Sequence, residues 1–215
     1  MTPLFLGAHV SSQGGVAHAP ERGRAIGANA IQVFTKSPNQ WREPRPDRAA
    51  PRAFREALAL HGIGAVVSHD SYLINLASPD AAMRARSEAA FAEELRRCEA
   101  FGIPWVVSHP GNFLGERSGG IRRNAESYAR CLAAVPGRVG VAIETTSGSG
   151  TALGATFEEL RALTDAHLWF AYWIGVYLVL GKKSVVSDVY VGGVIDGPLS
   201  NWLSRRLKDV RLGIG

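Results

Sequence analysis

Short apolar runs alternate with helical patterns along the chain up to about residue 165. Strand-like runs begin near residues 4, 30, 64, 104 and 139, and each is followed by a segment with helical composition and spacing. Strands that alternate with helices in this way are typical of a parallel α/β architecture, because each helix returns the chain to the start of the next strand. The pattern therefore predicts a parallel sheet covered by helices.

A (β/α) barrel of the TIM type is the natural candidate for this architecture. Five βα units are clear in the sequence, whereas a closed barrel needs eight units and about 250 residues. The predicted fold class is α/β, an incomplete TIM-type barrel of about five to six βα units followed by an atypical C-terminal tail.

Several residues are expected to define helix ends. Ser78 is expected to be the N-cap of the longest helix, with Pro79 in its first turn, and Gly102 is expected to follow its end. Thr156 is expected to cap a later helix. A helix is also expected near 122–134, after a glycine-rich loop.

The βα pattern ends after Asp165. Residues 168–181 are a dense apolar and aromatic run, too short for a bilayer-spanning helix, which needs about 20 residues. A segment rich in Val and Gly follows, and one long buried strand or two are expected in this part of the chain as a whole. We therefore divide the chain into a partial barrel, 1–165, and a divergent or frame-shifted tail, 166–215.

Three consecutive strand-like runs end in residues that bind metals. His69, His109 and Glu144 occupy these ends, and the carboxyl ends of parallel strands open onto one face of such folds. A single histidine at a strand end more often makes a core hydrogen bond, but three ligands at equivalent positions favour a metal site. Two imidazoles and a carboxylate suit Zn²⁺ or a related divalent ion, with a position left for water.

Composition and charge describe a globular protein with a mild preference for anionic partners. Hydrophobic residues make up 46% of the chain and charged residues 20%, with a net charge of +5 and a pI near 9.6. Such a charge fits a polyanion such as DNA, although solvated arginine-rich helices would give the same total. Cys98 and Cys131 are not in a CxxC arrangement, and the N-terminus lacks the features of a signal peptide, so a cytoplasmic location is expected.

Polar and aromatic residues follow the same strand ends. Gln40 and Trp41 lie in the loop after the second predicted strand, and Tyr72 lies just after His69. Such side chains suit stacking on bases or wedging between them, although loop aromatics more often form small local cores. His9, at the end of the first strand, could support a metal ligand, contact a substrate phosphate or make a structural hydrogen bond.

Five motifs in order make the sequence recognisable. LGAHVSSQGG, GANAIQVFTKSPNQW, SHDSYLINLASP, SHPGNFLG and AIETTSGSGTALG closely resemble the endonuclease IV family of AP endonucleases. The resemblance covers roughly residues 1–165. It implies a TIM-type barrel with a three-zinc cluster, which hydrolyses the phosphodiester 5′ to an abasic site in double-stranded DNA. The implied mechanism is metal-assisted phosphoryl transfer, which needs no side-chain nucleophile.

The resemblance also implies roles for individual residues. His69 and His109 match zinc-binding histidines, and Glu144 matches the catalytic carboxylate that bridges two metals. Tyr72 and Gln40 match loop residues that enter the DNA, and Asn39 stands where some members have an intercalating arginine. With Trp41 and His9, these residues form the predicted DNA-binding face.

The later motifs of the family are not found in residues 166–215. They comprise an Asp-x-x-His, a His-x-Asn-Asp and an Asp-x-His motif and a last glutamate, which supply the rest of the zinc cluster. At most one zinc site is therefore expected, and a truncated or frame-shifted product that is inactive or nearly so. The chain is expected to be a monomer that does not bind membranes.

Two other functions remain open from the residues. One is a xylose-isomerase-like sugar isomerase or epimerase, which shares the barrel and the metal-binding residue types. However, a small sugar needs neither a tyrosine nor a glutamine wedge. The other is a non-catalytic remnant that binds abasic DNA without turnover.

Overall fold

The strands of the chain form one curved sheet in chain order. The computed structural model describes residues 4–45, 47–165, 171–177 and 188–191. The strands are β1 (Gly7–His9), β2 (Ala30–Val33), β3 (Ala65–His69), β4 (Trp105–Ser108), β5 (Gly140–Glu144), β6 (Ala171–Tyr177) and β7 (Asp188–Val191). Strands β1 to β6 pair in parallel, and β7 pairs antiparallel to β6. The five predicted strands are confirmed.

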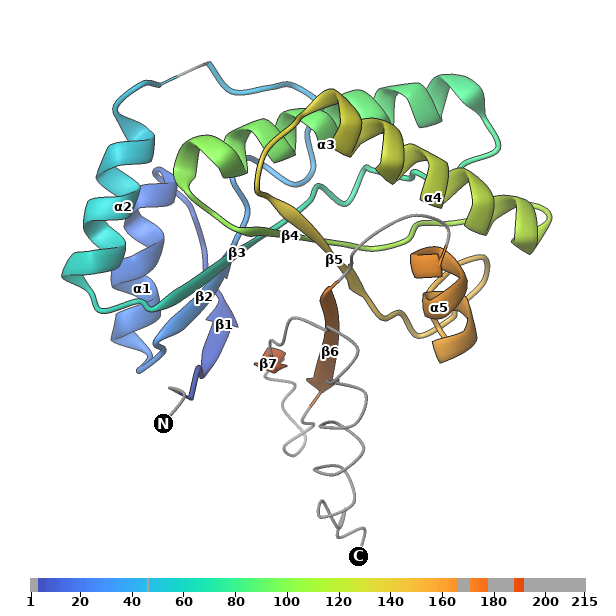
Figure 1. The fold of residues 1–215 in the computed structure, drawn as a ribbon. Helices are drawn as coiled ribbons and strands as arrows, with labels where there is room; N and C mark the ends of the chain where they lie inside the picture. Colours follow the sequence, from blue (N-terminus) through green and yellow to red (C-terminus); the bar gives the residue numbers. More distant parts are fainter. Residues whose placement is uncertain (1–3, 46, 166–170, 178–187, 192–215) are drawn as a thin grey trace, which may run out of the picture.

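Helices connect successive parallel strands up to β6. They are the 3-10 helix η1 (Val16–His18) and the α-helices α1 (Ala19–Ala25), α2 (Ala50–Leu60), α3 (Ala81–Phe101), α4 (Arg117–Ala134) and α5 (Phe157–Asp165). Consecutive α-helices contact one another, and α1 to α4 cover one side of the sheet in Figure 1. A curved parallel sheet with helices outside is the wall of a (β/α) barrel, as the sequence predicts.

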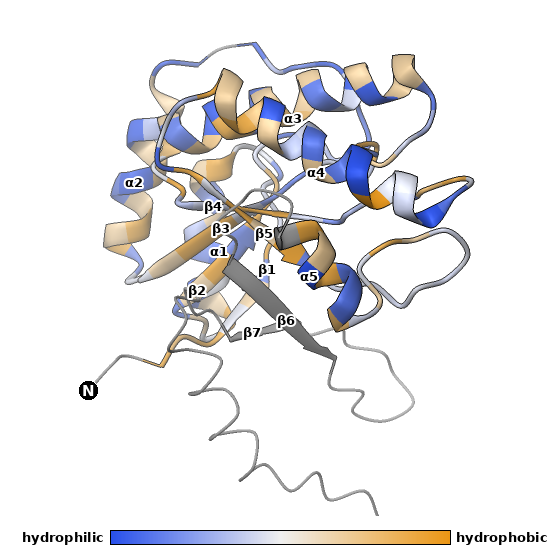
Figure 2. Ribbon diagram, turned by 45° about the vertical axis from the view of Figure 1, so that its right-hand side comes forward, coloured by the Kyte–Doolittle hydropathy of each residue, from blue (hydrophilic) through white to orange (hydrophobic). Residues whose placement is uncertain are grey.

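Alternate strand residues pack on the two faces of this wall. Val67, Val107 and Ala142 form a small cluster with Trp105, separate from the main core. The larger core includes Val66, which alternates with Val67, and lies between sheet and helices. In Figure 2 the helices alternate between apolar and polar residues, as expected for helices that bury one face. Both faces of the strands are therefore apolar, as in other parallel sheets.

The N-cap of α3 differs from the sequence prediction. Asp80, and not Ser78, is the N-cap, and its carboxylate accepts hydrogen bonds from the backbone N–H groups of Ala82 and Met83 at 2.8 and 3.2 Å. The Ser78 hydroxyl instead accepts the N–H of Asp80 in a turn before the helix. The prediction was wrong because Ser78 and Asp80 are both good caps, and the turn selects the second.

Helix α4 begins five residues earlier than predicted, at Arg117. The carboxylate of Glu116 caps it by accepting the N–H groups of Ser118 and Gly119. Gly120 lies inside the helix. A glycine is required at this position because a Cβ would clash with the Phe113 Cβ. Close packing thus overrides the low helix propensity of the glycines.

The tail predicted for 166–215 contributes two described strands, β6 and β7. Two strands are one of the two alternatives that the sequence allowed. The rest of the tail lies outside the described residues, and the division at residue 165 stays a prediction. No helix in the described part of the chain combines the length and hydropathy required to cross a membrane.

Replacing the cap of α3 should destabilise the fold measurably. We expect Asp80→Ala to lower the free energy of unfolding by about 1 kcal/mol, because two N–H groups lose their acceptor. Asp80→Asn keeps a side-chain oxygen and should stay within a few tenths of a kcal/mol of the parent. Urea denaturation followed by circular dichroism measures both. Equal stability of the alanine variant and the parent would contradict this assignment of the cap.

Candidate metal centre

The register of three neighbouring strands brings the predicted ligands together. His69 is the last residue of β3 and pairs with Val107 of β4, which in turn pairs with Ala142 of β5. His109 and Glu144 each lie two residues beyond these partners, so their side chains emerge on the same face of the sheet. Val67, Val107 and Ala142 form the small apolar cluster. Each of them lies two residues before one of the predicted ligands, so the cluster lies on the same face of the sheet as the site.

The ligand atoms lie close enough to share an ion. His69 Nε2 is 2.9 Å from Glu144 Oε2, and His109 Nε2 is 3.7 Å from the same oxygen. One ligand atom from each residue lies within 4.8 Å of the other two. Ligands of a tetrahedral zinc at about 2.0–2.1 Å from the ion are roughly 3.3 Å apart. The observed distances bracket this value, so the three residues fit a divalent ion.

The buried His69 is hydrogen-bonded to Glu144, which is partly buried. Burial lowers the pKa of His69, but the hydrogen bond to Glu144 and the charge of Asp70 outweigh it and raise this pKa to about 9. Burial raises the pKa of Glu144, but the hydrogen bond from His69 and the charge of His109 bring it below its usual value. Metal binding requires a deprotonated imidazole, so a metal ion would compete with the proton that the contact with Glu144 favours on His69.

Burial lowers the pKa of the other two histidines near the site. Burial and the charge of His69 lower the pKa of His109, although the charge of Glu144 opposes them. Burial and the charge of His69 also lower the pKa of His9 to about 4. His9 Nδ1 lies 2.9 Å from Gln32 Nε2, while its buried Nε2 has no hydrogen-bond partner among the described residues. A neutral imidazole is the form that binds metal.

Each ligand histidine follows a serine that contacts a buried carboxylate. Ser68 Oγ donates to Glu94 of α3, and Ser108 Oγ donates to Asp70 at 2.5 Å while accepting the Tyr128 hydroxyl at 2.8 Å. His69 contacts the backbone of the same residue, since its Nδ1 lies 2.8 Å from the Asp70 carbonyl oxygen. The contact at Nδ1 leaves Nε2 facing Glu144. Sequence reasoning missed these supports, although the repeated Ser-His pair hinted at them.

The loops beyond the ligands are tied to one another. Asn75, after β3, donates to the carbonyl of Asn112 and accepts the Asn112 N–H, both at 3.0 Å. Asn112, after β4, forms a β-bridge with Ala152, after β5. Gly111 allows this approach because it has a φ of +87°, and a Cβ there would clash with Asn75 Oδ1. The rim of the sheet is therefore cross-linked over three successive loops.

Most of the predicted DNA-binding residues lie on two loops, those after β2 and β3. Asn39 and Gln40 are exposed in the loop after β2, and Trp41 is half-buried with the Arg86 guanidinium 4.4 Å above its ring. Tyr72 is 60% exposed. Aromatic contacts join Tyr72 to the metal centre, because the Phe34 ring lies 5.2 Å from the Tyr72 ring and 5.6 Å from the His69 ring. A hollow beside them is lined by His9, Val10, Ser11, Ser12, Gln13, Phe34, Lys36, Ser37 and Pro38.

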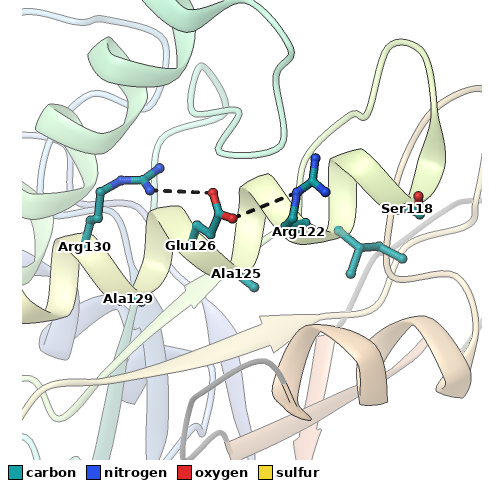
Figure 3. Close-up of a pocket in the computed structure, with 7 residues that line it drawn as sticks. Ser118, Arg122, Ala125, Glu126, Ala129 and Arg130 are labelled. Atoms are coloured by element: carbon teal, nitrogen blue, oxygen red, sulfur yellow. Dashed lines mark ion pairs between the residues drawn. The ribbon is translucent and has the colours of Figure 1, made fainter.

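A second hollow lies on α4. In Figure 3, Glu126 lies between two arginines, 4.0 Å from Arg122 and 3.8 Å from Arg130. These ion pairs are exposed and contribute little stability. The residues lining this hollow all come from α4, and none is a predicted site residue. It therefore offers no chemistry that competes with the metal centre.

Comparisons with known proteins agree with this architecture. A model of the xylose isomerase-like TIM barrel family matches residues 20–180. The probable endonuclease 4 of Geobacter sulfurreducens is 47% identical over 161 residues, which is 74% of this chain and 54% of that protein. The probable endonuclease 4 of Chloroflexus aurantiacus is 44% identical over 165 residues, 76% of this chain and 58% of that protein. The chain thus spans little more than half the length of these curated relatives.

Solved structures show the same relationship. The crystal structure of endonuclease IV from Thermus thermophilus matches with a TM-score of 0.67 and 33% identity, covering 77% of this chain and 61% of that one. An L-ribulose 3-epimerase matches with a TM-score of 0.62 and 16% identity, covering 80% of this chain and 60% of that one, which reflects the shared fold alone. The chain belongs to the xylose isomerase-like TIM barrel family, and its sequence places it with the endonuclease IV members.

Proposed function

We propose that this chain carries the DNA-binding face and one metal site of an endonuclease that hydrolyses the phosphodiester 5′ to an abasic site in duplex DNA. The observation that carries the proposal is the joint placement of two features. One ligand atom from each of His69, His109 and Glu144 lies within 4.8 Å of the other two, and the loops after β2 and β3 carry the exposed side chains of Gln40 and Tyr72.

The residues of the site divide into two roles. His69, His109 and Glu144 would hold a divalent ion, with zinc the ion that two imidazoles and a carboxylate suit. When bound, such an ion neutralises phosphate charge and activates water for hydrolysis. The side chains of Gln40 and Tyr72 would insert into the DNA double helix at the abasic site, where the missing base lowers the free-energy cost of insertion. Asn39, Trp41 and His9 complete this face.

Two features favour DNA over a sugar substrate. The relatives at 41–47% identity are named as probable endonucleases, whereas the epimerase structures share only 15–19% identity. An exposed tyrosine and an amide on separate loops also present a wide surface. A small sugar would instead need an enclosed pocket.

The number of ligands limits the rate of reaction. The described residues supply ligands for one ion, and the later motifs that complete a three-zinc cluster are not found in residues 166–215. Each metal ion supplies several kcal/mol of charge stabilisation in phosphoryl transfer. We therefore propose that the chain binds abasic DNA but cleaves it very slowly.

Zinc analysis tests the metal site. We expect the purified chain to bind one zinc, and His109→Ala to weaken this binding at least about 100-fold. This substitution suits the test because it leaves the buried His69–Glu144 pair intact. His18→Ala is the matched control, since His18 is exposed on η1. Equal zinc affinity of the His109 variant and the parent would exclude this site.

A nicking assay on a duplex with one abasic site tests the reaction. With zinc present, we expect cleavage on the 5′ side, roughly 1,000-fold slower than that by an endonuclease IV with a complete cluster, and abolished by EDTA. Cleavage at the full rate of such an enzyme would refute the rate limit. Binding of abasic DNA with no measurable turnover would leave only the binding function.

Tyr72 should provide much of the preference for abasic DNA. We expect Tyr72→Ala to weaken binding to an abasic duplex by about 1–3 kcal/mol, because an aromatic surface for stacking is lost. Tyr72→Phe retains the ring and should bind within a few-fold of the parent. Fluorescence anisotropy with abasic and intact duplexes separates these effects. An unchanged preference in the alanine variant would remove Tyr72 from the DNA-binding face.

A further inference from the structure

Lys36 begins the loop that carries the predicted DNA-binding residues after β2. A lysine at this edge would ordinarily be expected to contact a DNA phosphate. Its side chain, however, is only 5% exposed. The position of its ammonium group therefore needs a different explanation.

All three hydrogen-bond donors of the Lys36 ammonium group are directed at its own loop. Nζ donates to the carbonyl of Gln40 at 2.9 Å, to the carbonyl of Trp41 at 3.3 Å and to Glu43 Oε1 at 2.9 Å. A lysine ammonium has three N–H groups and no acceptor. The contacts thus account for its full donor capacity and fold the loop around it.

Glu43 connects this cluster to the protein core. Its Oε1 accepts from Lys36, and its Oε2 accepts from Arg97 of α3. Arg97 also donates to Glu94 at 2.5 Å and to Thr35 Oγ1 at 2.9 Å. Glu94 is 2% exposed, so a continuous set of charge-assisted hydrogen bonds runs from the core to the loop.

Two further contacts hold the outside of the loop. The Ser71 hydroxyl donates to the carbonyl of Pro38 at 2.5 Å, which joins this loop to the one that carries Tyr72. The Arg86 guanidinium packs on the Trp41 ring at 4.4 Å. The loop between Lys36 and Glu43 is therefore fixed at its base, at Pro38 and at Trp41.

We propose that Lys36 is a positioning residue, which shapes the β2–α2 loop for abasic DNA through Gln40, Trp41 and Glu43 and makes no phosphate contact itself. The DNA-binding half of this inference rests on the proposed function, whereas the loop-clamping half does not. A preformed loop lowers the entropy lost on binding, so the clamp raises DNA affinity without touching DNA.

Salt dependence distinguishes the two roles of a lysine. A phosphate contact contributes about one unit to the slope of log K against log salt concentration. Lys36→Met removes the charge and keeps a long apolar side chain. We expect it to lower abasic-duplex affinity about tenfold while leaving this slope unchanged.

Limited proteolysis provides a readout that needs no DNA. We expect chymotrypsin to cleave after Trp41 at least about tenfold faster in Lys36→Met, because charge-assisted hydrogen bonds of about 1.5–3 kcal/mol each are lost. Glu43→Gln is the milder variant, since it keeps an acceptor for Lys36, and it should show a smaller increase. Arg45→Met is the matched control, because Arg45 is exposed on the same loop. It should be cleaved at the parent rate.

The outcomes separate the inference from the proposed function. Unchanged cleavage in both Lys36→Met and Glu43→Gln would overturn the clamp. A slope reduced by about one unit in Lys36→Met would also overturn it, because Lys36 would then bind phosphate. Faster cleavage with unchanged affinity for abasic and intact duplexes would uphold the clamp and remove this loop from the DNA-binding face.

Discussion

The parallel register of β3, β4 and β5 is the constraint on which the site depends. Side chains alternate between the two faces of each strand, so a shift of one residue in any strand would turn its ligand toward the helices. The observed pairing of His69 with Val107 and of Ser108 with Ile143 places all three ligands on one face. The same alternation directs Ser68 and Ser108 to the opposite face, where they meet buried carboxylates.

Those buried carboxylates support the strand ends from the helical side of the sheet. Glu94 and Asp70 are 2% and 3% exposed, and burying a charged group without partners is costly. Glu94 is compensated by Thr35, Ser68 and Arg97. Asp70 accepts from Ser108, and burial raises the pKa of Asp70 to about 7 although His69 opposes this. These groups link the helices to the strand ends that carry the ligands.

The sequence predicts the strands and the proximity of His69, His109 and Glu144, because both follow from local patterns. Apolar runs that end in His69, His109 and Glu144 are visible without knowledge of the fold, and the parallel architecture then implies their proximity. The start of α4 was missed because the fit of Gly120 against Phe113 is a tertiary contact. The contacts of Lys36 could not be predicted either, since Glu43 and Arg97 are 54 residues apart and only the packing of α3 brings them together.

The cross-linked rim has a consequence for how the protein fluctuates. Asn75, Asn112 and Ala152 join the loops after β3, β4 and β5. A movement of any one of these loops therefore breaks hydrogen bonds that also hold a neighbouring loop. Local opening of the rim is then a cooperative event that involves all three loops. A disturbance at Asn112 would consequently reach the loops that follow His69, His109 and Glu144 at once.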